Sequence, residues 1–152
     1  MAHFAELDSD NKVLRVVVAC NQDIADNGGE QSAEAAEHFK TVLPLTSSGV
    51  KWVQTSYNNN FSKQFAGRGI LYNPSADVFY SPKPFPSWTL DENHDWNAPV
   101  TYPSVINDSE NEGLFIAWDE ENQKWTATGP DHINKGLLSF DWNTDTSSWD
   151  QV

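Results

Sequence analysis

Short apolar segments alternate along this chain with clusters of turn-forming residues. Residues 3–7 (HFAEL) and 12–20 (KVLRVVVAC) are rich in apolar and β-branched side chains, and DSDN lies between them. This pattern predicts an N-terminal β-hairpin. The second segment carries Val13 and then Val16–Val18 with little alternation, which predicts a central strand covered on both faces.

One segment has the spacing of a helix. Ala36, Phe39 and Leu43 recur at i, i+3 and i+7, Ser32 is a candidate N-cap and Pro44 follows the last apolar position. These features predict one helix within residues 31–43.

The neighbours of that helix have different compositions. Residues 21–30 (NQDIADNGGE) are predicted to form a loop. On the helix itself, His38 is expected to pair with Glu34 one turn back. Residues 50–58 (VKWVQTSYN) are predicted to form the next strand.

An Asn- and Gly-rich connection, NNNFSKQFAGRG, follows that strand and carries Phe61 and Phe65. Aromatic residues in such a polar loop either anchor it to the fold or present a contact surface. Phe61 and Phe65 are therefore candidate partner contacts. Farther on, Pro82, Pro84 and Pro86 alternate and predict a stiff, extended connector.

From residue 69 onward, aromatic residues flank turn-prone segments. Tyr72 and Tyr80 enclose one such segment, and six of the seven tryptophans form three similar pairs. An aromatic pair opposite across a hairpin contributes about 0.2–1 kcal/mol, so ring pairing would stabilise short hairpins. Exposed tryptophans also suit contacts with a protein or a sugar. The paired tryptophans, which are candidate partner contacts as well, are Trp88 with Trp96, Trp118 with Trp125, and Trp142 with Trp149.

Charge and cysteine content narrow the function classes. The net charge is −13, and residues 77–152 carry fourteen acidic against three basic side chains. Such a surface repels phosphate, so a nucleic-acid partner is not expected. The single cysteine, Cys20, rules out an internal disulfide and a Cys-based zinc cluster, and its apolar neighbours predict a buried thiol. The sequence contains neither a signal peptide nor a membrane span, so we expect no membrane association.

Motifs of catalysis are missing from the sequence. It contains no Gly-rich phosphate loop, HExxH, GxSxG or CxxC motif, and its acidic turns do not complete a calcium loop. We therefore predict a non-enzymatic protein without a cofactor or metal. The enzyme alternative would be a hydrolase with paired carboxylates such as Asp119 and Glu121.

Several segments in a specific order carry a family resemblance: MAHFAELD (1–8), VQTSYNNNF (53–61), AGRGILYN (66–73), PKPFPSWTLD (82–91) and WDEENQKW (118–125). Over residues 1–126 the chain resembles small virion-associated or hypothetical structural proteins of marine cyanophages and related tailed phages. The resemblance implies a virion protein made in the host cytoplasm, with other virion proteins as partners and room for multiple copies per particle. It supplies no catalytic residues.

Together, the patterns predict a β-rich α+β fold: an N-terminal hairpin and one helix packed on an antiparallel sheet, then a meander of short Trp-closed β-hairpins. Residues 1–128 are predicted to form this domain and residues 129–152 a C-terminal extension with one further β-hairpin. The predicted function is a structural component of a phage virion, with capsid decoration slightly favoured over a tail or fibre role. The alternative is a carbohydrate-binding module whose tryptophans form platforms for host surface glycans.

Overall fold

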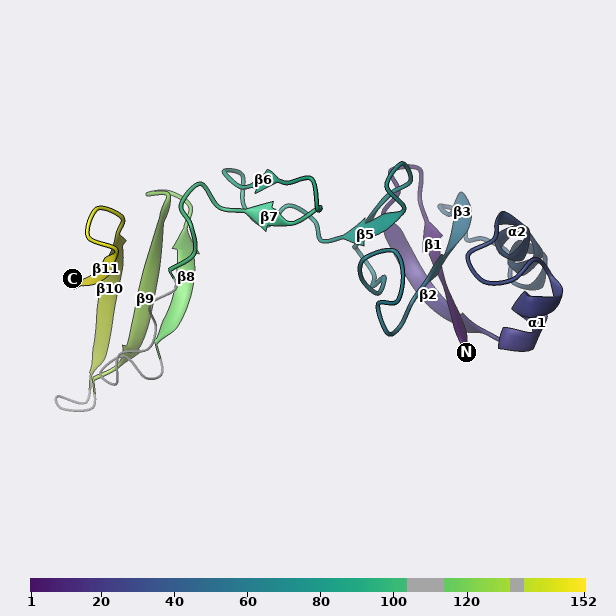
Figure 1. Cartoon of the computed structure of the whole chain (residues 1–152), viewed down its shortest axis with the longest axis horizontal. Helices are drawn as coiled ribbons and strands as arrows, with labels where there is room; N and C mark the ends of the chain where they lie inside the picture. Colours follow the sequence, from purple (N-terminus) through teal and green to yellow (C-terminus); the bar gives the residue numbers. More distant parts are fainter. Residues whose placement is uncertain (104–113, 132–135) are drawn as a thin grey trace. The chain divides into compact units, whose positions relative to one another are not determined.

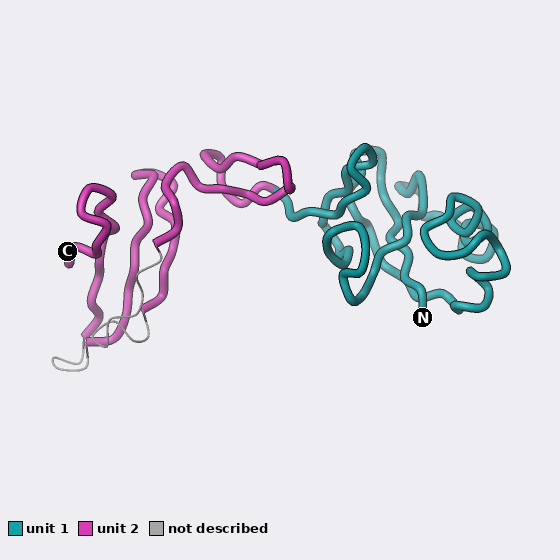
Figure 2. The backbone as a smooth tube through the Cα atoms, in the orientation of Figure 1, with its two compact units in different colours: residues 1–82 teal, residues 83–152 magenta. Residues whose placement is uncertain are grey.

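The computed structural model describes residues 1–103, 114–131 and 136–152. It divides into two compact units, unit 1 (Met1–Pro82) and unit 2 (Lys83–Val152), shown in Figure 2. The described chain contains two helices and several antiparallel sheets (Figure 1), which confirms the β-rich α+β class. The boundary between the two units falls between residues 82 and 83, whereas the sequence predicted domains of residues 1–128 and 129–152.

The sheet of unit 1 consists of β1 (Ala2–Leu7), β2 (Val13–Ala19) and β3 (Lys51–Thr55) in the antiparallel order β2-β1-β3. The prediction that residues 12–20 form a central strand was wrong, because β1 is central and β2 lies at an edge. Val16 and Val17 of β2 pack against opposite clusters of apolar residues. Since both faces of this sheet are covered, an edge strand also lacks the alternating pattern.

Two helices accompany this sheet, α1 (Asn21–Asp26) and α2 (Ala33–Val42). Helix α2 begins after Ser32, whose hydroxyl accepts a hydrogen bond from the Ala35 amide at 3.0 Å. Helix α1 lies where a loop was predicted. It has six residues, of which Ile24 alone is buried, so no helical periodicity can be recognised.

Side chains join these elements in ways that differ from the sequence predictions. His38 contacts the carboxylate of Asp23 at 3.0 and 3.1 Å and so links α2 to α1, rather than pairing with Glu34. Cys20 is exposed, so the prediction of a buried thiol was wrong. It is the N-cap residue of α1, which places it beyond the covered end of β2.

Apolar residues cover both faces of the unit 1 sheet. Phe4, Phe39 and Trp52 form the centre of one cluster, in which the rings of Phe4 and Phe39 are stacked with centroids 4.6 Å apart. On the other face, Leu7 and Phe79 are fully buried. Phe79 lies on a small hairpin of β4 (Leu71–Asn73) and β5 (Val78–Tyr80).

Unit 2 contains a short hairpin and a larger sheet. The hairpin pairs β6 (Thr89–Leu90) with β7 (Trp96–Asn97). The sheet has the antiparallel order β11-β10-β9-β8, with β8 at Phe115–Asp119, β9 at Lys124–Pro130, β10 at Leu137–Asn143 and β11 at Ser148–Gln151. Strand β9 spans the predicted domain boundary, and β10 pairs directly with it.

Three hairpins of the chain follow one rule of spacing. Tyr72 lies opposite Phe79, Trp118 opposite Trp125 and Trp142 opposite Trp149, always seven positions apart. Each loop has a residue with positive φ at the same place, and an Asn or Asp oxygen accepts backbone amide hydrogen bonds at its start. The positive-φ residues are Asp77, Gln123 and Ser147, and the capping residues are Asn73, Asp119 and Asn143.

Trp88 and Trp96 are eight positions apart and do not follow this rule. Trp96 lies opposite Leu90, across a shorter turn capped by Asp91. The N-terminal hairpin turn is built in the same way, because the Asp8 carboxylate accepts hydrogen bonds from the amides of Asp10 and Lys12. Because the spacing is eight positions rather than seven, Trp88 does not lie opposite Trp96, its predicted cross-strand partner.

Candidate functional site

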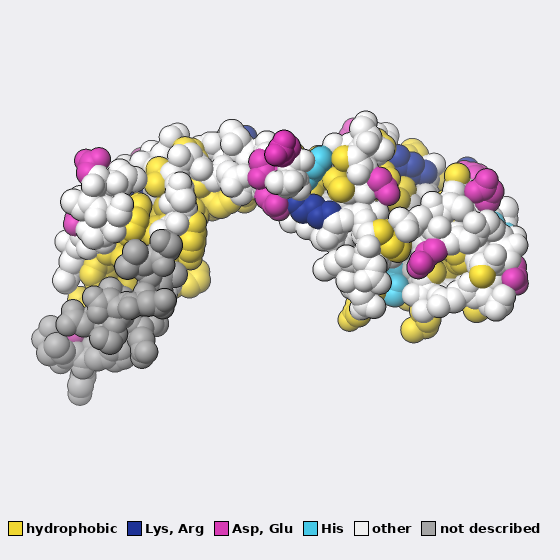
Figure 3. Space-filling view, in the orientation of Figure 1, with side chains coloured by type: hydrophobic (Ala, Val, Ile, Leu, Met, Phe, Trp, Pro, Cys, Tyr) yellow, Lys and Arg dark blue, Asp and Glu magenta, His cyan; other side chains and the backbone are white. Residues whose placement is uncertain are grey.

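The four-stranded sheet of unit 2 carries most of its large apolar side chains on one face. Opposite residues of paired strands share a face, and side chains alternate along each strand, so the register assigns every position. Figure 3 shows hydrophobic side chains collected over β8, β9 and β10. We call this surface the tryptophan face; it consists of Ile116, Trp118, Trp125, Ala127, Leu138, Phe140, Trp142 and Trp149.

The opposite face of this sheet is mostly polar. It carries Thr126, Thr128 and an ion pair between Lys124 and Asp141. Phe115 and Leu137 also lie on this face and are 71% and 80% exposed. The sheet is therefore amphipathic, as expected for an antiparallel sheet with one solvated side.

Rings on the tryptophan face are packed at steep angles. Trp118 and Trp125 are buried, with centroids 5.1 Å apart and planes at 68°. Trp142 and Trp149 are half-buried, with centroids 5.2 Å apart and planes at 66°. Edge-to-face contacts of this kind stabilise aromatic clusters, and within each pair the rings are not coplanar.

Residues 85–102 cover the part of the tryptophan face around Trp118 and Trp125. The ring of Trp88 lies 6.2 Å from Trp118 and 5.8 Å from Trp125, and Tyr102 lies 4.9 Å from Trp125. Trp125 also donates from Nε1 to the carbonyl of Val100 at 2.9 Å. Trp88 thus belongs to a ring cluster built from three parts of the sequence, which local spacing could not reveal.

Glu120 forms hydrogen bonds to both Ser87, at the end of the proline-rich connector, and Trp118 of the ring cluster. Its carboxylate accepts hydrogen bonds from the Ser87 amide and hydroxyl at 2.8 and 2.7 Å and from Trp118 Nε1 at 2.8 Å. The hydrogen bond from the Ser87 side chain, aided by Trp118, holds the pKa of Glu120 below its ordinary value. The indole N–H of Trp88 is also buried, yet no described residue accepts a hydrogen bond from it.

The carboxylates of the enzyme alternative have structural surroundings. Asp119 accepts hydrogen bonds from Asn122 Nδ2 and from its amide, at 2.8 and 3.2 Å. These bonds lower the pKa of Asp119, whereas a general acid at neutral pH needs a raised pKa. Glu121 is exposed at the tip of the same turn. This geometry favours a turn-capping role for Asp119.

Two hollows flank residues 97–102 in unit 2. The first, of about 400 Å³, is lined by the rings of Trp88, Trp96, Tyr102 and Trp125 together with Asn97 and Thr101. The second, of about 460 Å³, is lined by Thr101, Tyr102, Trp142, Thr144 and Ser147 with neighbouring apolar residues. Among the described residues, no charged side chain lines either hollow.

Of the two candidate residues of unit 1, Phe65 belongs to an aromatic cluster with His3 and Tyr57. Phe65 contacts His3 and Tyr57 edge-on, with centroids 5.4 and 5.3 Å away, and Tyr57 is 68% exposed. Phe61 is half-buried. The eight predicted contact residues therefore divide between the units: Phe61 and Phe65 lie in unit 1, and the six tryptophans lie in unit 2.

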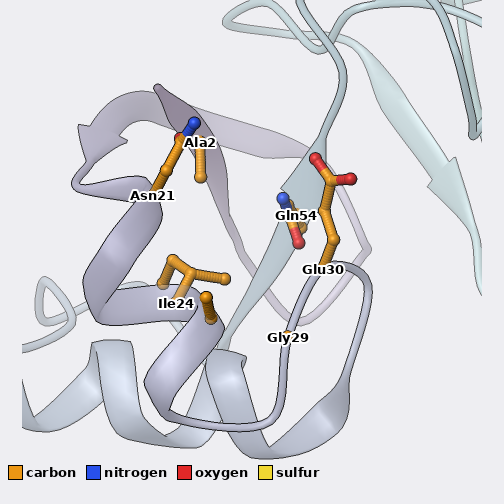
Figure 4. Close-up of a pocket in the computed structure, with 7 residues that line it drawn as sticks. Ala2, Asn21, Ile24, Gly29, Glu30 and Gln54 are labelled. Carbon is orange, nitrogen blue, oxygen red and sulfur yellow. The ribbon is translucent and has the colours of Figure 1, made fainter.

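Unit 1 also has a small pocket, of about 240 Å³, where β1, α1 and β3 meet. Figure 4 shows Ile24 directed into it, with the side chains of Glu30 and Gln54 at its rim. The Gln54 carbonyl oxygen already accepts a hydrogen bond from the Gln31 amide at 2.6 Å. Gln54 therefore fastens the loop after α1 to the sheet.

The described part of the chain holds no candidate metal centre and no candidate membrane-spanning helix. In residues 1–103, 114–131 and 136–152, no three His, Cys, Asp or Glu side chains are placed to hold a metal ion. No helix of that described part has the length and apolarity needed to cross a membrane. Comparison of the chain with protein-family models, curated proteins and solved structures finds no match.

Proposed function

We propose that the protein is a non-enzymatic structural component of a tailed-phage virion that binds capsid or tail proteins through the tryptophan face. The observation that carries this proposal is the collection of half-buried Leu138, Phe140, Trp142 and Trp149 on one side of an amphipathic sheet. Contiguous apolar surface rich in tryptophan is typical of protein interfaces. The virion as the setting, with synthesis in the host cytoplasm, rests on the resemblance of residues 1–126 to phage proteins.

Charge defines the chemistry of the partner. Residues 83–152 carry thirteen acidic and three basic side chains, a net charge of −10, against −3 for residues 1–82. A partner that meets the tryptophan face would present an apolar centre with basic residues at its rim. The same charge favours a place outside the DNA compartment, and among such places we favour capsid decoration over a tail role.

The alternative function, a carbohydrate-binding module, predicts flat platforms of exposed, coplanar tryptophans. The two ring pairs of the tryptophan face cross at 68° and 66°, and one of the pairs is buried. This arrangement supports protein contact over a flat sugar platform at the paired rings.

The experiment is mass spectrometry and cryo-electron microscopy of purified phage particles. We expect stoichiometric density for this chain on the head or tail, with Leu138 and Phe140 at the contact. Replacement of both by serine should abolish incorporation, and Phe115→Ser on the opposite face is the matched control. If the protein is abundant in infected cells but missing from particles, the proposal fails.

Strand addition at the edge of the sheet is a specific form of this contact. Strand β8 is an edge in the described strand order and can accept a further strand. Hydrogen exchange of residues 114–128 should then slow on assembly. Equal protection in the free and assembled protein would exclude pairing at β8 and leave side-chain docking as the mode of contact.

A further inference from the structure

We propose that the two hollows beside residues 97–102 form a binding site for a neutral oligosaccharide, with Trp96 and Tyr102 as its stacking rings. This function goes beyond the docking of virion proteins. Some of the paired tryptophans line these hollows, but the ligand would lie in the hollows rather than flat on a coplanar ring pair.

The lining of the first hollow has the chemistry that a sugar ring requires. A pyranose has a face of C–H groups with partial positive charge, which packs on the negative face of an aromatic ring. Trp96 and Tyr102 supply such rings, and Thr101 lies beside them with a hydroxyl group. Asn97 can contribute its amide oxygen, because its Nδ2 already donates to Asp91 Oδ2 and to the Asp95 carbonyl. Lys83 Nζ lies 5.8 Å from the centroid of Trp96, and this cation–π contact helps to orient the ring.

The second hollow extends the site beyond one sugar ring. It shares Thr101 and Tyr102 with the first hollow and adds Trp142, Thr144 and Ser147. The volumes of about 400 and 460 Å³ lie within the range of ligand pockets, roughly 300–1,000 Å³. Tyr102 therefore lies between two adjacent subsites, which suits an oligosaccharide better than a monosaccharide.

The charges select a neutral ligand. Among the described residues, no charged side chain lines the hollows, and the nearby Lys83 ammonium is already in contact with the ring of Trp96. The net charge of −10 on residues 83–152 repels anions as well. Binding should therefore be strongest for uncharged glycans and change little with salt.

A proline-rich peptide is the main competing occupant, because such peptides also dock in aromatic grooves. The polar groups favour the sugar. Thr101, Thr144 and Ser147 carry hydroxyls that both donate and accept hydrogen bonds. Sugar hydroxyls match them in both roles, whereas a polyproline segment has no backbone N–H to donate.

The test uses the purified full chain and three neutral probes, cellotetraose, chitotetraose and maltotetraose, with sialyllactose as an anionic comparison. Tryptophan fluorescence and saturation-transfer NMR report binding. We expect at least one neutral probe to bind at millimolar concentration or below, with contacts to aromatic protons. Sialyllactose should bind more weakly.

Two variants locate the site. Tyr102→Ala should weaken binding at least about tenfold, and it should fold because Tyr102 is 53% exposed. Trp96→Ala should do the same, with circular dichroism to check its fold. Phe115→Ala removes an exposed ring from the opposite face and should leave affinity unchanged.

Three outcomes would overturn the inference: no neutral probe binds, the affinities survive both variants, or a polyproline peptide binds at these residues in place of the sugars. None of these outcomes would contradict the virion proposal. Its particle experiment depends on Leu138 and Phe140, which lie outside both hollows.

Discussion

The two units of this protein build their small hydrophobic cores in different ways. Unit 1 has a sheet with apolar clusters on both faces, and Phe4, Leu7 and Phe79 are fully buried. Unit 2 has an amphipathic sheet in which large rings are buried mainly against one another. Its core is a cluster of tryptophans rather than a layer of aliphatic side chains.

The comparison shows how each construction constrains function. A sheet covered on both faces has little apolar surface left to offer a partner. A sheet covered on part of one face keeps half-buried rings at its margin, and its hairpins need aromatic pairs because short hairpins are marginal alone. In unit 2, the residues that stabilise the fold are therefore also the residues best placed for contacts.

The largest expected effect tests the tryptophan cluster of unit 2. Trp125→Ala removes a buried ring that contacts Trp88, Tyr102 and Trp118. Large-to-small changes of this kind cost about 3–5 kcal/mol. We expect hydrogen-exchange protection to be lost throughout residues 114–130 and retained in β1, β2 and β3, because the units are compact separately.

Phe115→Ala is the matched control for this variant. Phe115 is an aromatic residue of the same sheet, but it is 71% exposed on the other face. It should change the unfolding free energy by less than about 0.5 kcal/mol. If Trp125→Ala were equally mild, the ring cluster would not be the core of unit 2.

The next effect tests a buried charge in unit 1. Glu6 is fully buried, forms an ion pair with Arg15, and accepts hydrogen bonds from the amide and hydroxyl of Thr46 at 2.5 and 2.6 Å. Glu6→Gln should cost about 3 kcal/mol, because it leaves the Arg15 charge without its partner. Urea unfolding measures the loss, and Glu37→Gln on the exposed side of α2 should be nearly neutral.

Glu6 also gives unit 1 a pH dependence. Burial raises its pKa, but the hydrogen bonds from Thr46 and the Arg15 guanidinium outweigh burial and lower it. A lowered pKa in the folded state stabilises the fold above the ordinary glutamate pKa. This contribution should vanish as the pH falls through the folded pKa, and Glu6→Gln should flatten the acid limb of a plot of stability against pH.

Local sequence features explain which elements could be predicted. Ser32 and the apolar spacing after it located α2, and turn residues located the hairpins, because caps and turns are local chemistry. Helix α1 was missed because six residues with one buried position carry no periodic signal.

The ring cluster was harder to predict than the hairpins. Trp88 contacts Trp118 and Trp125, which lie 30 and 37 positions farther along the chain, and no local pattern encodes such contacts. The pairing of residues across the hairpins was easier to predict from the sequence. A spacing of seven places two rings opposite each other across the four-residue loop, and a spacing of eight does not.

A smaller loss of stability is expected when equivalent turn caps in the two units are removed. The Asn143 side-chain oxygen accepts hydrogen bonds from the amides of Asp145 and Thr146 at 3.0 and 3.2 Å. Asn143→Ala should cost about 1 kcal/mol and increase exchange in β11. Asn73→Ala in unit 1 removes the same type of cap but should leave β1 unchanged, since β5 is not part of that sheet. Thr144→Ala is the neutral control.

The smallest effect concerns the positive-φ residue that all three seven-position hairpins share. Gln123 and Ser147 have φ of 49° and 50°, a conformation that glycine adopts without steric cost. Gln123→Gly and Ser147→Gly should each stabilise unit 2 by about 0.5 kcal/mol, after the entropy of glycine is subtracted. Thermal unfolding measures the gain.

Asp77 occupies the same place in unit 1, with φ of 53°, but it should respond in the opposite direction. Its carboxylate accepts a hydrogen bond from the Tyr72 hydroxyl at 2.7 Å, and this contact helps to raise the pKa of Tyr72, for which burial is the larger cause. Asp77→Gly removes that acceptor along with the strain and should destabilise the hairpin. Stabilisation by glycine at all three positions would show that backbone strain outweighs side-chain hydrogen bonding in both units.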